Sequence, residues 1–193
     1  MSCLSSLRIL IAHPVDATRG EIIEALSDSH DVVATCDSIS DLRRLYRTHD
    51  PELVVVGVAF RDGDGIETMI ELGEENPTPS VIVTANRSIS MVEKAMEDHV
   101  MAYLIEPVRP QDIEAAIVVA CRRHDELNSL REEVDTLREA LENRKLIERA
   151  KGMLMASEGL SEEEAFARLR REAQDSRTRV VEVASRLMSQ RTV

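Results

Sequence analysis

The stretch NRKLIERAKGMLMASEGLSEEEAFARLRREA, residues 143–173, predicts two amphipathic helices joined by a short turn. Apolar side chains recur in its first half at the three- and four-residue spacing of one helix face: Leu146, Ile147, Ala150, Met153 and Leu154. Gly159 is expected to end this helix, because glycine adopts the left-handed C-terminal conformation without a side-chain penalty. Ser161 and Glu164 have the spacing of a capping box, which predicts the start of a second helix.

The second helix and a third one complete a small predicted bundle. The side chains expected to point inward on the second helix are Ala165, Phe166, Leu169 and Ala173. A third helix, after Asp175 and Ser176, has one apolar stripe made of Val180, Val183, Ala184 and Leu187. Arginine and lysine residues fall between these stripes. The sequence therefore predicts a three-helix unit with a charged outer face.

This segment resembles the ANTAR domain, the RNA-binding module of AmiR/NasR-type transcription antitermination regulators. The residues that carry the resemblance are Ala140, Arg144, Ile147, Ala150-Lys151-Gly152-Met153-Leu154-Met155, Gly159-Leu160-Ser161, Ala165-Phe166, Leu169-Arg170, Ala173 and Val183-Ala184. The resemblance implies that the unit binds a hairpin in a nascent transcript and prevents a competing terminator from forming.

Four residues of this segment are candidates for contacts with RNA. Arg144, Lys151 and Arg170 are expected to contact phosphates or loop bases, because arginine planes suit unstacked bases. Gly152 is expected to allow close approach of the backbone to RNA. No aromatic stacking platform is expected, because Phe166 is assigned to the core.

Charge is distributed unevenly along this acidic chain, whose formal net charge is −12. Residues 1–124 carry a net charge of −10, residues 125–143 carry −5, and residues 144–193 carry +3. An acidic protein attracts nucleic acid only weakly over long distances. RNA binding would therefore depend on locally placed arginines and on shape. The alternative interpretation of these arginines is an ordinary solvated helix face.

The first half of the chain alternates apolar strands with helices. The expected strands are Leu7–Ala12, Asp31–Thr35, Leu53–Val56, Ser80–Thr84 and Ala102–Ile105. The helices expected between them are Gly20–Leu26, Ser40–Arg47, Ile66–Leu72 and Ser88–Glu97. Near-continuous apolar strands separated by helices indicate a parallel sheet covered on both faces. The predicted fold class is α/β, with five strands in the flavodoxin-like order 2-1-3-4-5.

This half resembles a response-regulator receiver domain. The matching segments are Leu7–Ala12, Pro51–Val54, Asp64–Ile66, Thr84-Ala85 and Tyr103–Pro107. The phosphorylation site of the family is not retained. His13 and Pro14 stand in the positions of the acidic pair, Gly57 in that of the phosphoacceptor aspartate, and Glu106 in that of the lysine. Only the hydroxyl residue, Thr84, matches the family pattern, so the receiver is expected to be degenerate.

These substitutions predict a site that neither holds Mg²⁺ nor accepts phosphate. Gly57 has no nucleophile, and the residues that replace the acidic pair lack the hard oxygen ligands that Mg²⁺ requires. Glu106 reverses the charge that should stabilise a phosphoryl group. The alternative acceptors are Asp16, Asp62 and Asp64 in nearby loops, although loop carboxylates are ordinarily solvated turn formers.

A long helix is expected between the two halves. Pro110 is well placed at a first helical position, and neither proline nor glycine follows until Gly152. Apolar residues step along this helix by 3, 4, 3 and 4 as a heptad repeat: Leu127, Leu130, Val134, Leu137 and Leu141. A single helix cannot bury such a stripe alone, which predicts a parallel homodimer. The alternative is an intramolecular hairpin against the bundle.

No metal site and no membrane segment are expected. Cys3, Cys36 and Cys121 are scattered without metal-ligand spacing, which indicates reduced thiols. His13 has no second His or Cys nearby in sequence, so a packed or solvated ring is expected. No apolar run approaches the roughly 18–20 residues that span a bilayer, and no signal peptide is expected, because the N-terminus lacks a charged start and a long apolar stretch.

The expected domains are a receiver-like domain at 1–124, a coiled-coil linker at 125–143 and an ANTAR-like domain at 144–193. The expected function is that of a cytoplasmic, non-enzymatic homodimer that binds leader RNA without a cofactor and does not bind DNA. The resemblance also implies a ligand-sensing partner protein that docks on the degenerate receiver. The alternatives are a phosphorylation-gated response regulator, a DNA-binding regulator, and a dimeric protein-binding adaptor that does not bind RNA.

Overall fold

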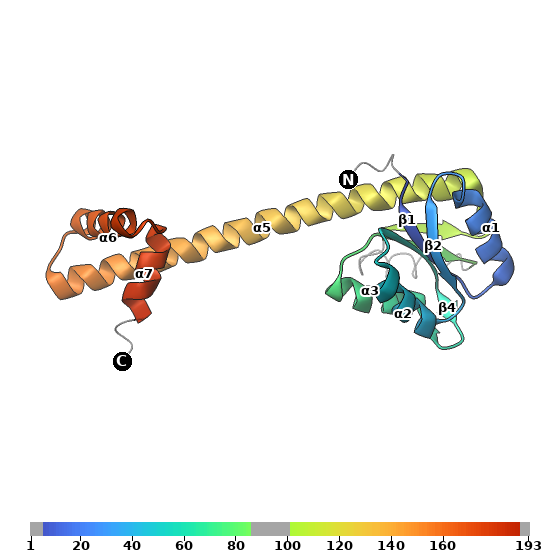
Figure 1. Ribbon diagram of the computed structural model, residues 1–193, viewed down its shortest axis with the longest axis horizontal. Coiled ribbons are helices and arrows are strands. Elements are labelled where there is room, and N and C mark those ends of the chain that lie inside the picture. The colour runs from blue at the N-terminus through green and yellow to red at the C-terminus, as the bar shows by residue number, and fades with distance from the viewer. Residues whose placement is uncertain (1–5, 86–100, 190–193) are drawn as a thin grey trace. The chain divides into compact units, whose positions relative to one another are not determined.

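The computed structural model describes residues 6–85 and 101–189, and the chain divides into two compact units (Figure 1). The N-terminal unit ends at Asn128 and the C-terminal unit begins at Ser129. One uninterrupted helix, α5 (Pro110–Glu158), contributes to both units, as the sequence predicted. Within the described ranges, no helix is both long and apolar enough to span a lipid bilayer.

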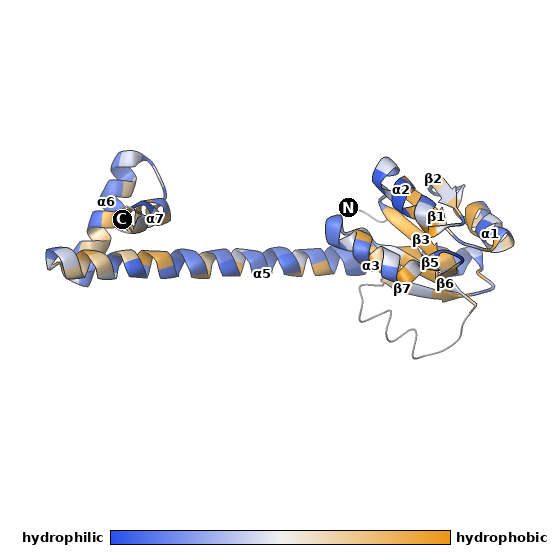
Figure 2. Cartoon of the chain, turned by 90° about the horizontal axis from the view of Figure 1, so that it is seen from below, coloured by the Kyte–Doolittle hydropathy of each residue, from blue (hydrophilic) through white to orange (hydrophobic). Residues whose placement is uncertain are grey.

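The N-terminal unit contains the predicted five-stranded parallel sheet. Its strands are β1 (Arg8–Ala12), β2 (Asp31–Cys36), β3 (Leu53–Gly57), β6 (Ser80–Thr84) and β7 (Ala102–Ile105). Their order is β2-β1-β3-β6-β7, and every neighbouring pair is parallel. Figure 2 shows the apolar colour of the central strands β1 and β3. The flavodoxin-like order 2-1-3-4-5 is therefore confirmed.

Three shorter helices connect the strands: α1 (Asp16–Leu26), α2 (Ile39–His49) and α3 (Gly65–Glu75). A two-stranded antiparallel hairpin, β4 (Ala59–Phe60) with β5 (Gly63–Asp64), was not predicted. Strands of two residues are too short to produce a detectable apolar alternation. The helix expected at Ser88–Glu97 lies outside the described residues.

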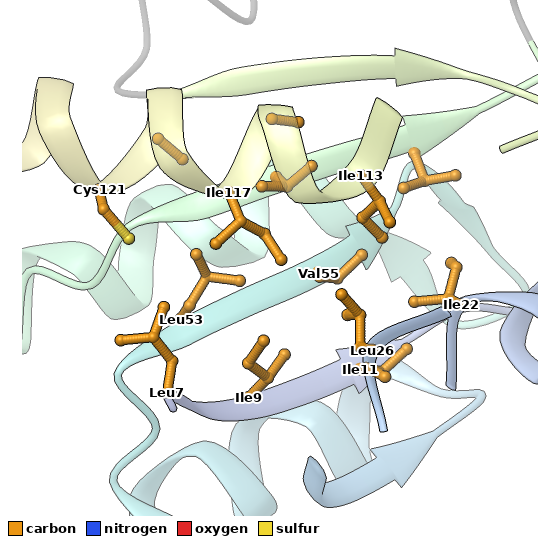
Figure 3. Close-up of a cluster of buried hydrophobic side chains, with 14 of the residues drawn as sticks. Leu7, Ile9, Ile11, Ile22, Leu26, Leu53, Val55, Ile113, Ile117 and Cys121 are labelled. Carbon is orange, nitrogen blue, oxygen red and sulfur yellow. The ribbon is translucent and has the colours of Figure 1, made fainter. Parts of the chain in front are cut away.

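Each face of the sheet is covered by its own apolar cluster. Ile9, Ile11, Leu53 and Val55 pack with helices α1 and α5 on one face (Figure 3). The α5 side chains in this cluster include Ile113, Ile117 and Cys121. The opposite face joins alternate strand residues to α2 and α3 through Leu10, Val54, Ile82, Leu42 and Leu72. The start of α5 is therefore an integral part of the receiver core.

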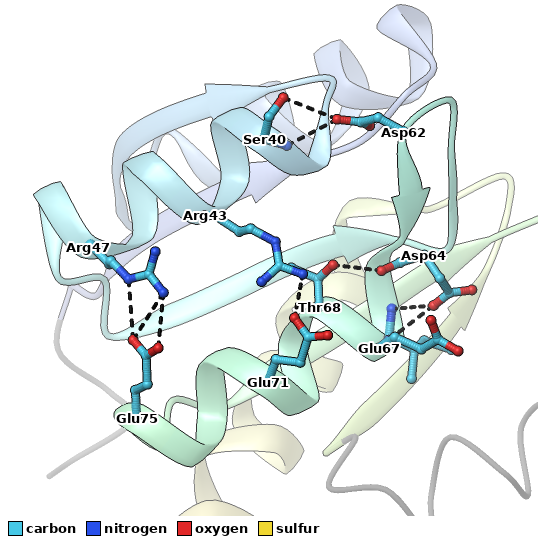
Figure 4. Close-up of polar contacts among 10 residues, drawn as sticks. Ser40, Arg43, Arg47, Asp62, Asp64, Glu67, Thr68, Glu71 and Glu75 are labelled. Carbon is cyan, nitrogen blue, oxygen red and sulfur yellow. Dashed lines mark hydrogen bonds and ion pairs between the residues drawn. The ribbon is translucent and has the colours of Figure 1, made fainter.

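Two aspartates of the β4–β5 region fix the starts of helices. Asp62 accepts hydrogen bonds from the backbone amides of Ile39 (3.0 Å) and Ser40 (3.1 Å) at the start of α2. These bonds hold the pKa of Asp62 below its usual value. Asp64 caps α3 by accepting from the amides of Ile66 (2.7 Å) and Glu67 (3.1 Å). Figure 4 shows the contact of Asp62 with Ser40 and that of Asp64 with Glu67, together with the ion pairs Arg43–Glu71 and Arg47–Glu75 between α2 and α3.

The C-terminal unit combines the end of α5 with α6 (Glu162–Ser176) and α7 (Val180–Ser189). Gly159 ends α5 with a left-handed φ of 70°, and Ser161 with Glu164 forms the predicted capping box. The buried core consists of Ala150, Leu154, Ala165, Leu169, Ala173, Val183 and Ala184. The three predicted helices are therefore confirmed.

The prediction that Phe166 belongs to this core is wrong. Its side chain is 43 % exposed, whereas Ala165, Leu169 and Ala173 are 0–4 % exposed. These three residues follow a four-residue step along one side of α6. Phe166 is one residue, or about 100°, further around the helix, which turns its ring away from that side.

The heptad stripe of α5 is exposed in the single chain. Its exposed fractions are 39 % at Leu127, 57 % at Leu130, 44 % at Val134, 62 % at Leu137 and 53 % at Leu141. Polar residues occupy the positions between them, so apolar and polar colours alternate along this part of α5 in Figure 2. A regular apolar stripe of this kind on a charged helix is typical of coiled-coil segments.

Candidate nucleic-acid interface and receiver centre

The residues predicted to replace the phosphorylation set lie together at the carboxyl ends of the strands. His13, which follows β1, is 3 % exposed, and its Nε2 lies 3.5 Å from Glu106 Oε1. On the other side of the ring, His13 Nδ1 lies 3.2 Å from the Val15 amide nitrogen and 3.3 Å from the Val15 carbonyl oxygen. Thr18 Oγ1 donates to the other Glu106 oxygen at 2.9 Å. The Glu106 carboxylate therefore has partners from β1 and α1.

Gly57 at the end of β3 has no room for a side chain. A Cβ atom at this position would lie 2.8 Å from His13 Cδ2 and 2.9 Å from Pro14 Cδ. Both distances are shorter than real Cβ contacts, so His13 and Pro14 occupy the volume of a residue-57 side chain. Thr84 is buried and hydrogen-bonds Tyr103, whose pKa is raised by burial.

The alternative acceptor carboxylates all have other contacts. Asp16 pairs with Arg19 in the first turn of α1, and its side chain is 94 % exposed. Asp62 and Asp64 cap α2 and α3. In residues 6–85 and 101–189, no group of three or more His, Cys, Asp or Glu side chains is arranged to hold a metal ion. The thiol of Cys36 is free and buried, and burial raises its pKa to about 11.

Lys151, one of the predicted RNA contacts, is buried between α5 and α6. Its ammonium lies 2.9 Å from both Glu148 oxygens and 2.7 Å from Glu162 Oε1. The hydrogen bond to Glu162, followed by that to Glu148, raises the pKa of Lys151, and the same contact lowers the pKa of Glu162. A contact between Lys151 and an RNA phosphate would require these ion pairs to open. Its predicted role in RNA binding is untested, and the geometry favours a role in joining the helices.

The other three predicted RNA contacts are exposed. Arg144 on α5 and Arg170 on α6 form no ion pair with any carboxylate in the described part of the chain. Gly152 is exposed, and a Cβ atom added there would meet nothing within 4 Å. Packing within the unit therefore does not require glycine at this position. Arg144 is exposed whereas Lys151 is buried, so these two residues do not form one exposed basic surface.

A shallow depression on α6 brings Arg170 beside Phe166. Its lining residues are Glu163, Phe166, Ala167, Arg170, Arg171 and Gln174, and its volume is about 420 Å³. The sequence analysis missed Phe166 as a candidate site residue. The signal was present, because Phe166 departs by one position from the four-residue step of Ala165, Leu169 and Ala173.

We expect the Lys151 ion pairs to stabilise the C-terminal unit in a pH-dependent manner. Substitution Lys151→Met should lower the thermal stability of this unit near neutral pH. Because pairing depresses the pKa of Glu162 below its usual 4.5, the stabilisation is present above pH 4.5 and is lost as the pH falls through the folded-state pKa. The melting temperatures of wild type and variant, followed by circular dichroism, should therefore converge in acid.

The matched control is Lys145→Met, because Lys145 pairs with Glu142 at 2.7 Å but half of its side chain is exposed. Exposed pairs contribute little to stability, so this variant should melt close to wild type at every pH. Equal melting of wild type and Lys151→Met at neutral pH would contradict a structural role for Lys151.

Comparisons with known families assign both units. The ANTAR domain family matches residues 135–188, and the response regulator receiver domain family matches residues 9–118. The signal receiver domain of the response regulator NarL from Mycobacterium tuberculosis superposes with a TM-score of 0.56. This alignment covers 59 % of the present chain and 94 % of that domain at 20 % identity, which concerns the fold alone.

Two sequence relatives extend the comparison. The transcriptional regulatory protein PdtaR of Mycobacterium tuberculosis (strain H37Rv) is 36 % identical over 178 residues, 92 % of this chain and 87 % of PdtaR. The nitrate regulatory protein of Klebsiella oxytoca is 45 % identical over 64 residues, 33 % of this chain and 16 % of that protein. The chain belongs to the response regulators in which a receiver domain is followed by a C-terminal ANTAR domain.

Proposed function

We propose that this protein is an RNA-binding transcription antitermination regulator whose receiver is not phosphorylated. The observation that carries the proposal is the ANTAR unit itself, with arginines on its surface that no carboxylate in the described residues neutralises. Arg144, Arg170 and Arg171 are the proposed contacts with the RNA hairpin. Binding of a hairpin in the leader transcript would prevent the competing terminator from forming. Gly152 is proposed to allow close approach of the RNA backbone.

The receiver is proposed to act as a docking surface for a partner protein that senses a ligand. Two features support this proposal. The volume needed by a phosphoacceptor side chain is taken by His13 and Pro14, and Glu106 stands where the receiver family has a lysine. Control through protein contact would need neither Mg²⁺ nor phosphate. The rival function is a phosphorylation-gated regulator that uses another aspartate. The carboxylates of Asp62 and Asp64 already accept hydrogen bonds at the starts of α2 and α3, which counts against this rival.

The long helix is proposed to hold two chains together, with a receiver-like domain at 1–124, a coiled-coil linker at 125–143 and an RNA-binding domain at 144–193. The support is the exposed stripe from Leu127 to Leu141, whose spacing is that of a two-stranded coiled coil. Burial of such a stripe supplies roughly 1.5–3 kcal/mol for each fully covered Leu or Val side chain. A dimeric adaptor that binds only proteins remains the second rival, and RNA titration separates it from the main proposal.

The RNA contact is tested by replacing both exposed arginines. The double variant Arg144→Ala with Arg170→Ala should fold and dimerise as wild type but bind a leader hairpin roughly 10- to 100-fold more weakly. Its affinity should also depend less steeply on salt, because each lost phosphate contact removes about one unit of slope. Fluorescence titrations at two salt concentrations measure both effects.

The control for this test is Arg122→Ala, which removes an exposed arginine of α5 outside both the stripe and the C-terminal unit. This variant should keep the affinity of wild type. If the double variant binds as tightly as wild type, with the same salt slope, then Arg144 and Arg170 do not contact the RNA and are ordinary solvent-exposed residues.

The assembly is tested at two stripe positions. Leu130→Asp combined with Leu137→Asp should give monomers, because the charged side chains lose apolar burial and cost desolvation. Thr136→Asp is the control, since it adds a charge on the same helix outside the stripe. Sedimentation velocity at micromolar concentration measures the result. A monomeric wild type would rule out the coiled-coil proposal.

The loss of phosphorylation is tested with acetyl phosphate and Mg²⁺, followed by intact-mass spectrometry. Neither wild type nor Gly57→Asp should gain a phosphoryl group. The single substitution should fail because its Cβ atom meets His13 and Pro14, and because Glu106 stands in place of the stabilising lysine. Stoichiometric phosphorylation of the wild type would favour the phosphorylation-gated rival.

A further inference from the structure

Phe166 is an exposed aromatic ring in a polar and charged setting. Its side chain is 43 % exposed, although the chain has very few aromatic residues and the unit has a complete apolar core without it. The ring lines the depression on α6 together with Ala167, Arg170 and Gln174. Folding of the unit therefore gives no reason for an aromatic side chain at this position.

The side chains around the ring can bind a nucleobase. Arg170 and Arg171 offer planar guanidinium groups that form no ion pair with another described residue. Gln174 can donate and accept hydrogen bonds, whereas Glu163 at the other end can only accept them. A phosphate placed beside Glu163 would be repelled, but an exocyclic amino group of a base would not. This mixture fits the edge of an unpaired base better than the RNA backbone.

The ring is also held in place before any ligand arrives. The Lys151 ammonium lies 6.0 Å from the centroid of the Phe166 ring, within the range of a cation–π contact. Lys151 is itself fixed by Glu148 and Glu162. An aromatic side chain that is already ordered loses little conformational entropy when a base stacks on it. The buried lysine thus positions the ring, while much of the ring faces solvent.

Building on the proposed RNA binding, we infer that Phe166 is the stacking platform for one unpaired base in the loop of the bound hairpin. Arg170 and Gln174 lie beside it to contact the edge of that base. Sequence-tolerant stacking of loop bases on aromatic side chains is a common basis of single-stranded RNA recognition. This assignment replaces the expectation that the unit has no stacking platform.

The test uses the full-length protein and a hairpin selected by the wild type from a pool with a randomised loop. Phe166→Ala should bind this hairpin roughly 5- to 100-fold more weakly, whereas Phe166→Tyr should stay close to wild type. The salt slope should not change, because no phosphate contact is lost. Met155→Ala is the matched control, since Met155 is 39 % exposed in the same unit but does not line the depression.

A double-mutant cycle then identifies the base. An abasic site at the stacked loop position should weaken binding by the wild type as much as Phe166→Ala does, and the two changes together should cost little more. Additive losses at every loop position, or unchanged binding by Phe166→Ala, would overturn the inference while RNA binding itself stands. A normal RNA affinity with weakened dimerisation would assign the ring to a protein contact instead. Failure of the wild type to enrich any hairpin would overturn both the proposed function and this inference.

Discussion

The packing of one helix into two separate cores is the constraint on which the rest of the molecule depends. Ile113 and Ile117 of α5 are buried against the receiver sheet, and Ala150 and Leu154 are buried in the three-helix unit. Neither unit has a complete core without its part of α5. The segment between the two cores carries large apolar side chains with no cover in the single chain. The folding of the single chain does not explain these apolar side chains, which is why we propose that dimerisation takes place there.

The receiver domain has the sheet order of its family, but the residues at the carboxyl ends of its strands differ from the family pattern. In a phosphorylated receiver, several carboxylates close together carry a negative charge that Mg²⁺ balances. Here an imidazole ring, that of His13, lies against the Glu106 carboxylate, with 3.5 Å between His13 Nε2 and Glu106 Oε1. The ring that makes this contact also takes the space beside Gly57. His13 thus contacts Glu106 and also fills the space beside Gly57, which is why we expect that changing Gly57 alone does not create a phosphorylation site.

The sequence predicted the elements with long repeating patterns and missed features that depend on one residue's position. Continuous apolar strands and the steps of Leu127 to Leu141 extend over enough residues to define the sheet order and the long helix. The β4–β5 hairpin is too short to produce such a pattern. Phe166 was predicted to be buried and is exposed, whereas Lys151 was predicted to be exposed and is buried. Both predictions followed residue type, because aromatic rings are usually buried and ammonium groups are usually solvated. The position of Phe166 follows from the four-residue step on α6, which the sequence already contains. The position of Lys151 depends on carboxylates of two different helices, Glu148 and Glu162, which only the folded chain brings together.

The central claim is that the ANTAR unit acts on RNA without a phosphorylation signal. The most direct test is transcription in vitro from a template whose leader contains the hairpin and a terminator, with purified protein as the only addition. Read-through should rise with protein concentration, acetyl phosphate should not change it, and Arg144→Ala with Arg170→Ala should abolish most of it. Read-through that appears only after treatment with acetyl phosphate, or that never rises above the protein-free level, would contradict the account.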